Sequence, residues 1–199
     1  MPRYSKKQKA ALDALMREEV YRHAKEIIEA DGVQGLTLDR LARAIGVSRG
    51  TLYNYFADRD AILEHVEQET FAPLVERLER VADGDARPTD KLRRIVRLIL
   101  ESVHENRALV VALIPEKHHG ALREGQIRRQ AWGLALLQRV VEQGIAAGEF
   151  RELPPRRVAE IVLGSLTGTI ELMARNEQSP EPDEIAEPLL QILLGGLER

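Results

Sequence analysis

The side chains with the clearest chemical potential form a short run from Ser48 to Asn54, in the sequence SRGTLYN. This run supplies hydroxyl groups, a guanidinium and an amide, but no carboxylate. Such groups donate hydrogen bonds to phosphate oxygens and to base edges. Arg49 could read guanine and Asn54 could read adenine, or both could hold phosphates. The competing interpretation of the run is the solvated polar face of an ordinary helical corner.

Two short helices must position this run. Thr37 is a suitable N-cap for the first helix, expected to end at Ile45, and Ser48 is a suitable N-cap for the second, expected to reach Phe56. Only Gly46-Val47 separates them, so the helices must cross sharply, and glycine tolerates the left-handed backbone that such a turn requires. Helical spacing places these residues on the inner faces: Leu38, Leu41, Ala42, Ile45, Leu52 and Tyr55. The sequence therefore predicts a helix-turn-helix.

The string GVSRGTLYNYFADRDAIL at Gly46–Leu63, with TLDRLARAIG before it and AKEIIEADG at the end of the preceding helix, resembles the DNA-binding region of TetR-family (tetracycline-repressor-like) transcriptional regulators. The resemblance implies that the chain binds double-stranded, palindromic operator DNA as a homodimer and that a small-molecule inducer in the C-terminal domain releases the DNA. The family tendency favours a repressor over an activator. By resemblance, these residues contact DNA: Thr37, Ser48, Arg49, Gly50, Thr51, Tyr53, Asn54, Tyr55 and Arg59.

Charge is divided unevenly along the chain. Residues 1–60 carry eleven Lys and Arg against nine Asp and Glu, whereas the rest of the chain carries eighteen against twenty-three. The first ten residues contain no acid and four basic side chains, which are Arg3, Lys6, Lys7 and Lys9. Because such a cluster suits a polyanion, we expect an N-terminal arm that contacts the DNA backbone or the minor groove.

A periodicity near 3.6 residues over almost the whole chain predicts an all-α fold of about nine helices. We expect a three-helix head with the helix-turn-helix in residues 1–60, and a ligand-binding and dimerisation domain in residues 61–199. Asp31-Gly32 should stop the first long helix, Pro73 should kink or divide a later one, and Pro188 should disturb the start of the last. No apolar run is long enough for a membrane span and no cysteine is present, so we expect a cytoplasmic protein without disulfides.

The last two helices carry more apolar and small side chains than one chain of this shape would easily hide. In TetR-like proteins the two corresponding helices pair with their twofold copies, so the resemblance implies a dimer interface here. The alternative is the core of a monomer. The residues expected at the interface are Ile161, Gly164, Ser165, Gly168, Leu189 and Leu193.

An effector pocket between about Asp60 and Asn176 is a further implication of the resemblance. The candidates are polar or aromatic groups on otherwise apolar faces, namely Phe71, His104, Trp132 and Met173. Each of them could instead be an ordinary core residue. Because only 4% of the residues are aromatic, the composition favours an aliphatic or small effector.

Histidines offer the main enzymatic alternative. His118-His119 lies close to Glu116 in the loop PEKHHG, and His104 lies near Glu101 and Glu105. Adjacent histidines point in different directions, unlike the i, i+4 pairs that bind zinc from one helical face. A helical adaptor would be a third class of protein, but it would not account for the polar run of the second short helix. We therefore expect a ligand-responsive DNA-binding regulator with no catalysis, no metal and no cofactor.

Overall fold

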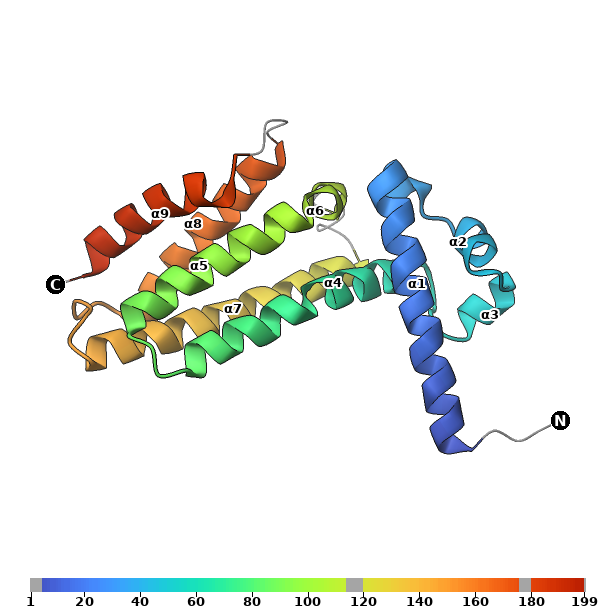
Figure 1. Ribbon diagram of the computed structural model, residues 1–199, viewed down its shortest axis with the longest axis horizontal. Coiled ribbons are helices and arrows are strands. Elements are labelled where there is room, and N and C mark those ends of the chain that lie inside the picture. Colours follow the sequence, from blue (N-terminus) through green and yellow to red (C-terminus); the bar gives the residue numbers. More distant parts are fainter. Residues whose placement is uncertain (1–4, 114–119, 176–179, 199) are drawn as a thin grey trace.

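The computed structural model describes residues 5–113, 120–175 and 180–198 of the 199-residue chain. Across these ranges the chain forms nine α-helices and no β-strand, which confirms the predicted all-α class (Figure 1). None of the described helices is both long enough and apolar enough to cross a membrane. The helices are α1 (Lys6–Gly35), α2 (Leu38–Ile45), α3 (Arg49–Tyr53), α4 (Arg59–Asp83), α5 (Pro88–Glu105), α6 (Arg107–Leu113), α7 (Gly120–Ala146), α8 (Pro155–Arg175) and α9 (Pro182–Leu197).

The first helix starts close to the N-terminus. Ser5 and Gln8 form a capping box, in which the Ser5 hydroxyl accepts from the Gln8 backbone N–H at 3.2 Å and the Gln8 side-chain oxygen accepts from the Ser5 N–H at 2.9 Å. α1 therefore begins at Lys6. Near its other end Gly32 has a φ of 69°, so the helical backbone is interrupted at the predicted stop even though α1 extends to Gly35.

The helix-turn-helix forms as predicted, but its second helix is shorter. Thr37 caps α2, and Gly46 adopts a φ of 82° at its end. Ser48 caps α3, which ends at Tyr53 rather than at Phe56. After Tyr53 the backbone tightens, because the N–H groups of the next two residues donate to carbonyls only three residues back.

Buried side chains form two clusters that share α4. The head cluster joins α1, α2 and α3 to the start of α4 and to α6, and the body cluster joins the rest of α4 to α5, α7, α8 and α9. α4 contributes Ile62, Leu63 and Val66 to the first cluster and Leu78 and Ala82 to the second. We call α1–α3 the head and α4–α9 the body; the division at residue 60 stays a prediction, because α4 belongs to both clusters.

Prolines do not interrupt the two helices in which the sequence suggested a disturbance. α4 continues through Pro73 as one helix of 25 residues, so it is not divided there. α9 already begins at Pro182 and includes the exposed Pro188, so the expectation of a disturbed start is wrong. Each proline removes one backbone donor, but the neighbouring turns and the packed side chains keep the helix continuous.

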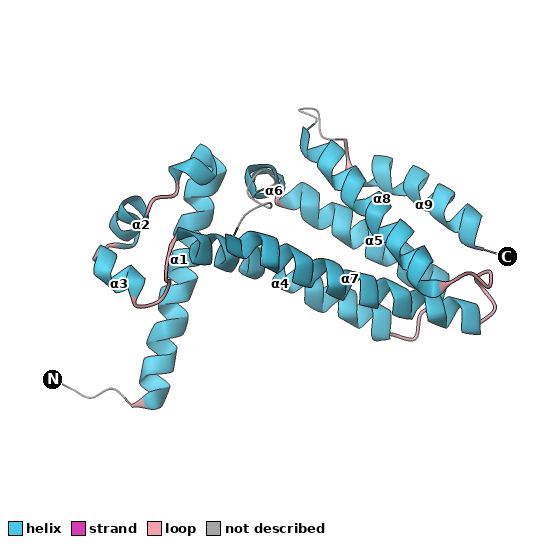
Figure 2. Ribbon diagram, turned by 180° about the vertical axis from the view of Figure 1, so that it is seen from behind, coloured by secondary structure: helices cyan, strands magenta, loops and turns pink. Residues whose placement is uncertain are grey.

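The body is elongated, and α1 stands across one end of it (Figures 1 and 2). α7 packs along both α4 and α8, while α5 packs along α4, α7 and α9. As a result α8 and α9 lie on the same long side of the body, away from α4 (Figure 2). Their outward sides have no covering element among the described residues.

A compact corner joins α7 to α8 in the string EQGIAAGEFR. Gly148 has a φ of 73°, and the fully buried ring of Phe150 folds back onto Gly144, where a Cβ would lie 2.1 Å from a ring carbon. Glu149 accepts hydrogen bonds from the Thr89 hydroxyl at 2.7 Å and the Thr89 N–H at 3.1 Å. These bonds hold the pKa of Glu149 below its ordinary value and satisfy a free donor in the first turn of α5.

Candidate nucleic-acid interface

The polar run identified in the sequence lies on the outward side of α3 and its flanks. Ser48, Arg49, Gly50, Tyr53 and Asn54 are all exposed, and we call these five residues the recognition surface. α3 presents them together because its single buried residue, Leu52, anchors the other side of the helix in the head cluster. The surface offers cationic, hydroxyl and amide donors, which are the groups that contact phosphates and base edges.

Arg49 is already held in place on this surface. Its Nη1 lies 3.3 Å from Asp39 Oδ2, its Nη2 donates to the Tyr53 hydroxyl at 3.2 Å, and its guanidinium carbon lies 5.6 Å from the Tyr53 ring centroid. The hydrogen bond to Tyr53 and the charge of Asp39 raise the pKa of Arg49 above its ordinary value. Sequence reasoning found no acid in the run and missed Asp39, because the turn between the helices brings it over from α2. An exposed pair of this kind is weak because water and salt screen it, so DNA could displace it.

Gly50 has no packing role in the free protein. A Cβ at this position would meet only Ser48 Oγ, at 3.8 Å. The fold therefore tolerates a side chain here, and a close approach of the backbone to a partner gives a physical reason for the glycine.

Four other predicted DNA contacts take part in the fold. Thr37 caps α2, and Thr51 donates its N–H to Ser48 Oγ at 3.1 Å. Tyr55 is half-buried against the head cluster. Arg59 donates to the backbone carbonyls of Leu36 and Val33, which fastens the link between α1 and α2 to the start of α4. The contacts of these four residues with DNA stay predictions. The hydrogen bonds by which Arg59 joins α4 to the end of α1 could not be foreseen from the sequence.

A second exposed surface, of opposite character, runs along α8 and α9. Ile192, Leu172 and Ile161 are 75%, 70% and 63% exposed, more than any other large hydrophobic residue described. Gly164 and Gly168 lie on the same side of α8 as Ile161 and Leu172, with no atom within 4 Å of where a Cβ would stand. We call these five residues the apolar face.

The other predicted interface residues sit deeper than the apolar face. Ser165 is half-buried and donates its hydroxyl to the Ile161 carbonyl at 2.8 Å. Leu189 and Leu193 are half-buried against the body cluster. An interface on these two helices therefore stays a prediction. Its outermost contacts would come from Leu172 and Ile192, which the predicted set did not contain.

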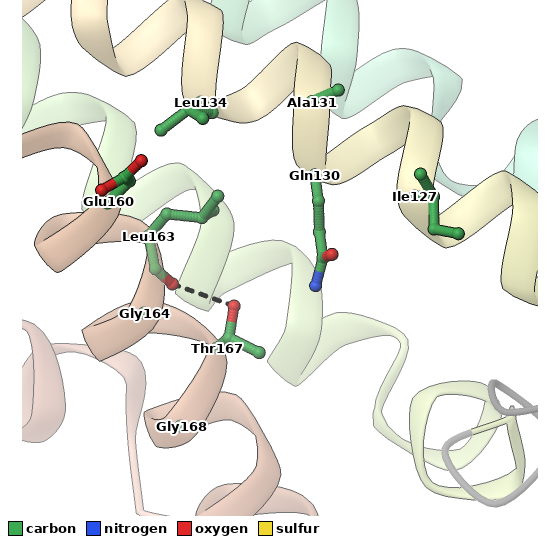
Figure 3. Close-up of a pocket in the computed structure, with 9 residues that line it drawn as sticks. All are labelled: Ile127, Gln130, Ala131, Leu134, Glu160, Leu163, Gly164, Thr167 and Gly168. Atoms are coloured by element: carbon green, nitrogen blue, oxygen red, sulfur yellow. Dashed lines mark hydrogen bonds between the residues drawn. The ribbon is translucent and has the colours of Figure 1, made fainter. Parts of the chain in front are cut away.

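A groove of about 510 Å³ borders the apolar face between α7 and α8 (Figure 3). α7 contributes the side chains of Ile127, Gln130, Ala131 and Leu134 (Figure 3). α8 contributes its other wall, including Gly164 and Gly168 of the apolar face. The Thr167 hydroxyl faces inward to its own helix, donating to the Leu163 carbonyl at 2.9 Å, so it is not available as a polar anchor. The groove is thus mainly apolar, with Gln130 and Glu160 as its polar lining residues, and it lies next to the apolar face.

The four candidate effector residues are not brought together. Phe71 lines a groove of about 390 Å³ between α4 and α7, and Trp132 lines a neighbouring one of about 240 Å³. Met173 is buried in the body cluster, and His104 is half-buried near the end of α5. Only Phe71 and Trp132 therefore share a region, and it lies where the first half of α7 packs on α4.

Ion pairs cross-link α4 to α7 on both sides of these grooves. Arg128 pairs with Glu64, and Arg129 pairs with Glu67, whose side chain is only 2% exposed. Further along α4, Glu79 accepts hydrogen bonds from Arg139 and from the indole N–H of Trp132. Both bonds lower the pKa of Glu79, and the bond from Arg139 has the larger effect. Sequence reasoning found Trp132 but not the carboxylates that hold it.

Metal chemistry finds no support in the described ranges, which contain no group of three or more His, Cys, Asp and Glu side chains able to hold an ion. The pair His118-His119 and Glu116 lie outside the described residues. His104 has no partner at its buried Nδ1. The enzymatic alternative therefore gains no site from the part of the chain that the structure describes.

Comparisons with known proteins match both halves of the chain to one family. The model for "Bacterial regulatory proteins, tetR family" matches residues 20–66, and the model for "Tetracyclin repressor-like, C-terminal domain" matches residues 85–197. The fatty acid metabolism regulator protein of Bacillus subtilis is 25% identical over 87% of this chain and 91% of its own length. The nucleoid occlusion factor SlmA of Vibrio campbellii is 24% identical over 83% of this chain and 87% of its own length.

Among solved structures, the transcriptional regulator FadR from Bacillus subtilis in complex with stearoyl-CoA superposes with a TM-score of 0.78. It is 22% identical, and the match covers 90% of this chain and 98% of that one. The fold described above is therefore that of a known regulator over nearly its whole length.

Proposed function

The chain belongs to the TetR family of bacterial regulatory proteins, and from this premise we propose that it acts in the cytoplasm as a dimeric repressor whose α3 reads a palindromic operator. Members of this family are ligand-responsive transcriptional regulators that bind DNA, and this chain carries both domains. It acts by binding rather than by catalysis, with DNA at one end of the molecule and an effector in the body.

The recognition surface carries the proposal. Arg49, Tyr53 and Asn54 stand exposed on the second helix of the helix-turn-helix, supported by a buried Leu52 and by two capped helices. Helices in this position enter the major groove and contact base edges. Ser48 and the backbone near Gly50 are placed to meet phosphates, since they lie at the exposed start of α3.

Dimerisation follows from the apolar face. Burying Ile161, Leu172 and Ile192 against a second copy removes the most exposed apolar side chains of the described chain from water. The groove of Figure 3 adjoins this face, so a helix of the partner could extend into it. A twofold arrangement places two α3 helices on half-sites about 34–36 Å apart, one turn of DNA.

The effector is proposed to bind where Phe71 and Trp132 line the grooves between α4 and α7. α4 reaches from the body cluster into the head cluster, so a ligand that moves α4 against α7 would move the head. A long-chain acyl-CoA is the first effector to test, because the similar FadR structure contains stearoyl-CoA. The apolar walls formed by Phe71, Ala72 and Val75 suit an acyl chain.

The test is fluorescence anisotropy of a labelled fragment from upstream of the gene, compared with a scrambled fragment, over a series of salt concentrations. We expect tight and sequence-selective binding with a steep salt dependence, as phosphate contacts require. Selection from a random-sequence DNA library then covers an operator located elsewhere. Binding that is weak and equal for all sequences in both experiments would overturn the proposal.

The effector is tested in the same assay by adding stearoyl-CoA to the preformed complex. We expect release of DNA, and Phe71→Ala should reduce that response while leaving DNA binding intact. If stearoyl-CoA binds nothing and releases nothing, this effector class is wrong, whereas the assignment of the recognition surface is unaffected.

A further inference from the structure

We propose that the first half of α1, residues 6–19, is a second DNA-binding element that contacts backbone phosphates beside the site read by α3. This proposal rests on the proposed function, since it assumes that α3 binds DNA. It assigns a role to a segment that precedes the family match, which begins at residue 20. The N-terminal arm expected from the sequence is, from Lys6 onward, part of a continuous helix.

The segment overhangs the head. Its first buried residue is Val20, and the 14 residues before it extend α1 by roughly 21 Å at 1.5 Å per residue. Figure 1 shows this part of α1 projecting past α2 and α3 toward the N-terminus, with no other described element beside its tip. The capping box of Ser5 and Gln8 fixes its start, so its side chains have defined directions.

The overhang has a basic side, and that side is turned toward the head. Arg17 places its guanidinium carbon 5.1 Å from the ring centroid of Phe56, just beyond α3, and the Arg17 carbonyl lies 3.0 Å from His65 Nε2 of α4. At about 100° per residue, Lys6 and Lys9 lie within about 80° of the direction of Arg17. Beyond Arg17, the side of α1 that packs on the head thus carries Lys6 and Lys9 toward the tip, with Asp13 one helical turn from both Lys9 and Arg17 on the same side.

The opposite side of the overhang differs in character. Leu15 is 59% exposed and lies directly opposite Lys6 and about 120° from Lys9, whereas Leu12, which is 44% exposed, lies at the border of the two sides, about 60° from Lys9. The three acids of the overhang, Asp13, Glu18 and Glu19, all follow the lysines, and no carboxylate of the described chain forms an ion pair with Lys6, Lys7 or Lys9. Unpaired cations on the side where α2 and α3 lie are complementary to a polyanion bound by α3.

Phosphate is the ligand that these observations support, rather than bases. Lysine is a flexible point charge and carries no fixed geometry for base edges. The overhang should therefore increase affinity for all sequences alike, and its contribution should depend on salt. Removing one lysine that neutralises a phosphate should reduce the slope of log affinity against log salt by about 0.9.

The experiment compares two double variants of the full chain, Lys6→Gln/Lys9→Gln and Arg156→Gln/Arg157→Gln, by anisotropy on the selected operator. Both remove two positive charges, but Arg156 and Arg157 lie at the start of α8, at the far end of the body from the head (Figure 1). Glutamine preserves the helix, which circular dichroism checks. We expect Lys6→Gln/Lys9→Gln to lower the slope of log affinity against log salt by about 1.8 per protomer and to lower the affinity by about tenfold or more at low salt. Its preference for the operator sequence should be unchanged. Arg156→Gln/Arg157→Gln should change neither the slope nor the affinity.

A third variant tests direction. Adding Ala11→Lys and Leu15→Lys to Lys6→Gln/Lys9→Gln restores the charge of the overhang on its opposite side, since both positions are exposed and lie about 120° or more from Lys6 and Lys9, and we expect it not to restore the slope. Equal slopes for the wild type and for Lys6→Gln/Lys9→Gln would overturn the proposal, as would restoration by the third variant. If the wild type itself bound no DNA, the proposed function would fail. If the wild type bound DNA and the lysine variants bound it with the same affinity and salt slope, the overhang proposal alone would fail.

Discussion

The recognition surface and the apolar face are both exposed, but they are exposed for different physical reasons. The first presents a guanidinium, hydroxyls and an amide that water solvates well, so its exposure costs little and its partner must offer charge. The second presents Ile161, Leu172 and Ile192 to water, which costs free energy until a partner covers them. The two surfaces should therefore respond differently to salt, with DNA binding weakened and dimerisation largely maintained.

The largest effect should come from charging the apolar face. Leu172→Glu/Ile192→Glu removes two side chains whose full burial stabilises by about 1.5–3 kcal/mol each, and it does so on both copies. We expect the dimer dissociation constant to rise by at least about 100-fold, measured by analytical ultracentrifugation. Operator affinity should fall with it, while helix content stays constant. A variant that remains dimeric at micromolar concentration would show that this face is not the interface.

Arg49→Ala should weaken DNA binding by the recognition surface and leave the dimer intact. A good side-chain contact with a base contributes about 1–3 kcal/mol, so operator affinity should fall by roughly 10- to 100-fold. Sedimentation should still show a dimer. If only non-specific binding fell while the preference for the operator remained, Arg49 would be a phosphate contact and not a reader of bases.

Arg59→Met distinguishes residues that bind DNA from residues that stabilise the head. Arg59 donates to two backbone carbonyls at the end of α1, and charge-assisted hydrogen bonds contribute about 1.5–3 kcal/mol each at most. We expect a lower thermal midpoint for Arg59→Met and an unchanged midpoint for Arg49→Ala. Equal midpoints for Arg59→Met and the wild type would mean that water replaces these bonds at no cost.

The smallest effect is expected from Asp39→Asn. It frees Arg49 from an exposed and therefore weak ion pair, so operator affinity should rise by no more than about fivefold. The gain should vanish in the Arg49→Ala background, which identifies the pair as its origin. A fall in affinity would instead indicate that Asp39 orients Arg49 toward the DNA.

Local chemistry made the helix-turn-helix predictable. Thr37, Gly46 and Ser48 act within a few residues of their positions, so their types alone fix the caps and the turn. The partners of Arg49 and Arg59 were not predictable in this way. Asp39 lies ten residues before Arg49, and Val33 lies 26 residues before Arg59. The family resemblance predicted an interface on the last two helices, whereas the exposure of Leu172 and Ile192 depends on how α8 and α9 rest on the body.

The same limit applies to the corner between α7 and α8. The sequence shows Gly144 and Phe150 but not that the ring of one lies against the backbone of the other. It likewise shows Trp132 but not Glu79, its hydrogen-bond partner 53 residues earlier. Long-range contacts of this kind are set by the packing of whole helices, which a periodic pattern does not encode.

α4 gives the molecule a mechanical property. Pro73 leaves one backbone hydrogen bond of the helix unmade, between the turns that pack in the body and those that pack in the head. The start of α4 lies 14 residues before it, a lever of roughly 21 Å at 1.5 Å per residue. A change of about 10° in bend at that point would displace Arg59 by roughly 4 Å, more than the rise between neighbouring base pairs. A strain too small to disturb the packing of the body would thereby be amplified into a loss of register on DNA.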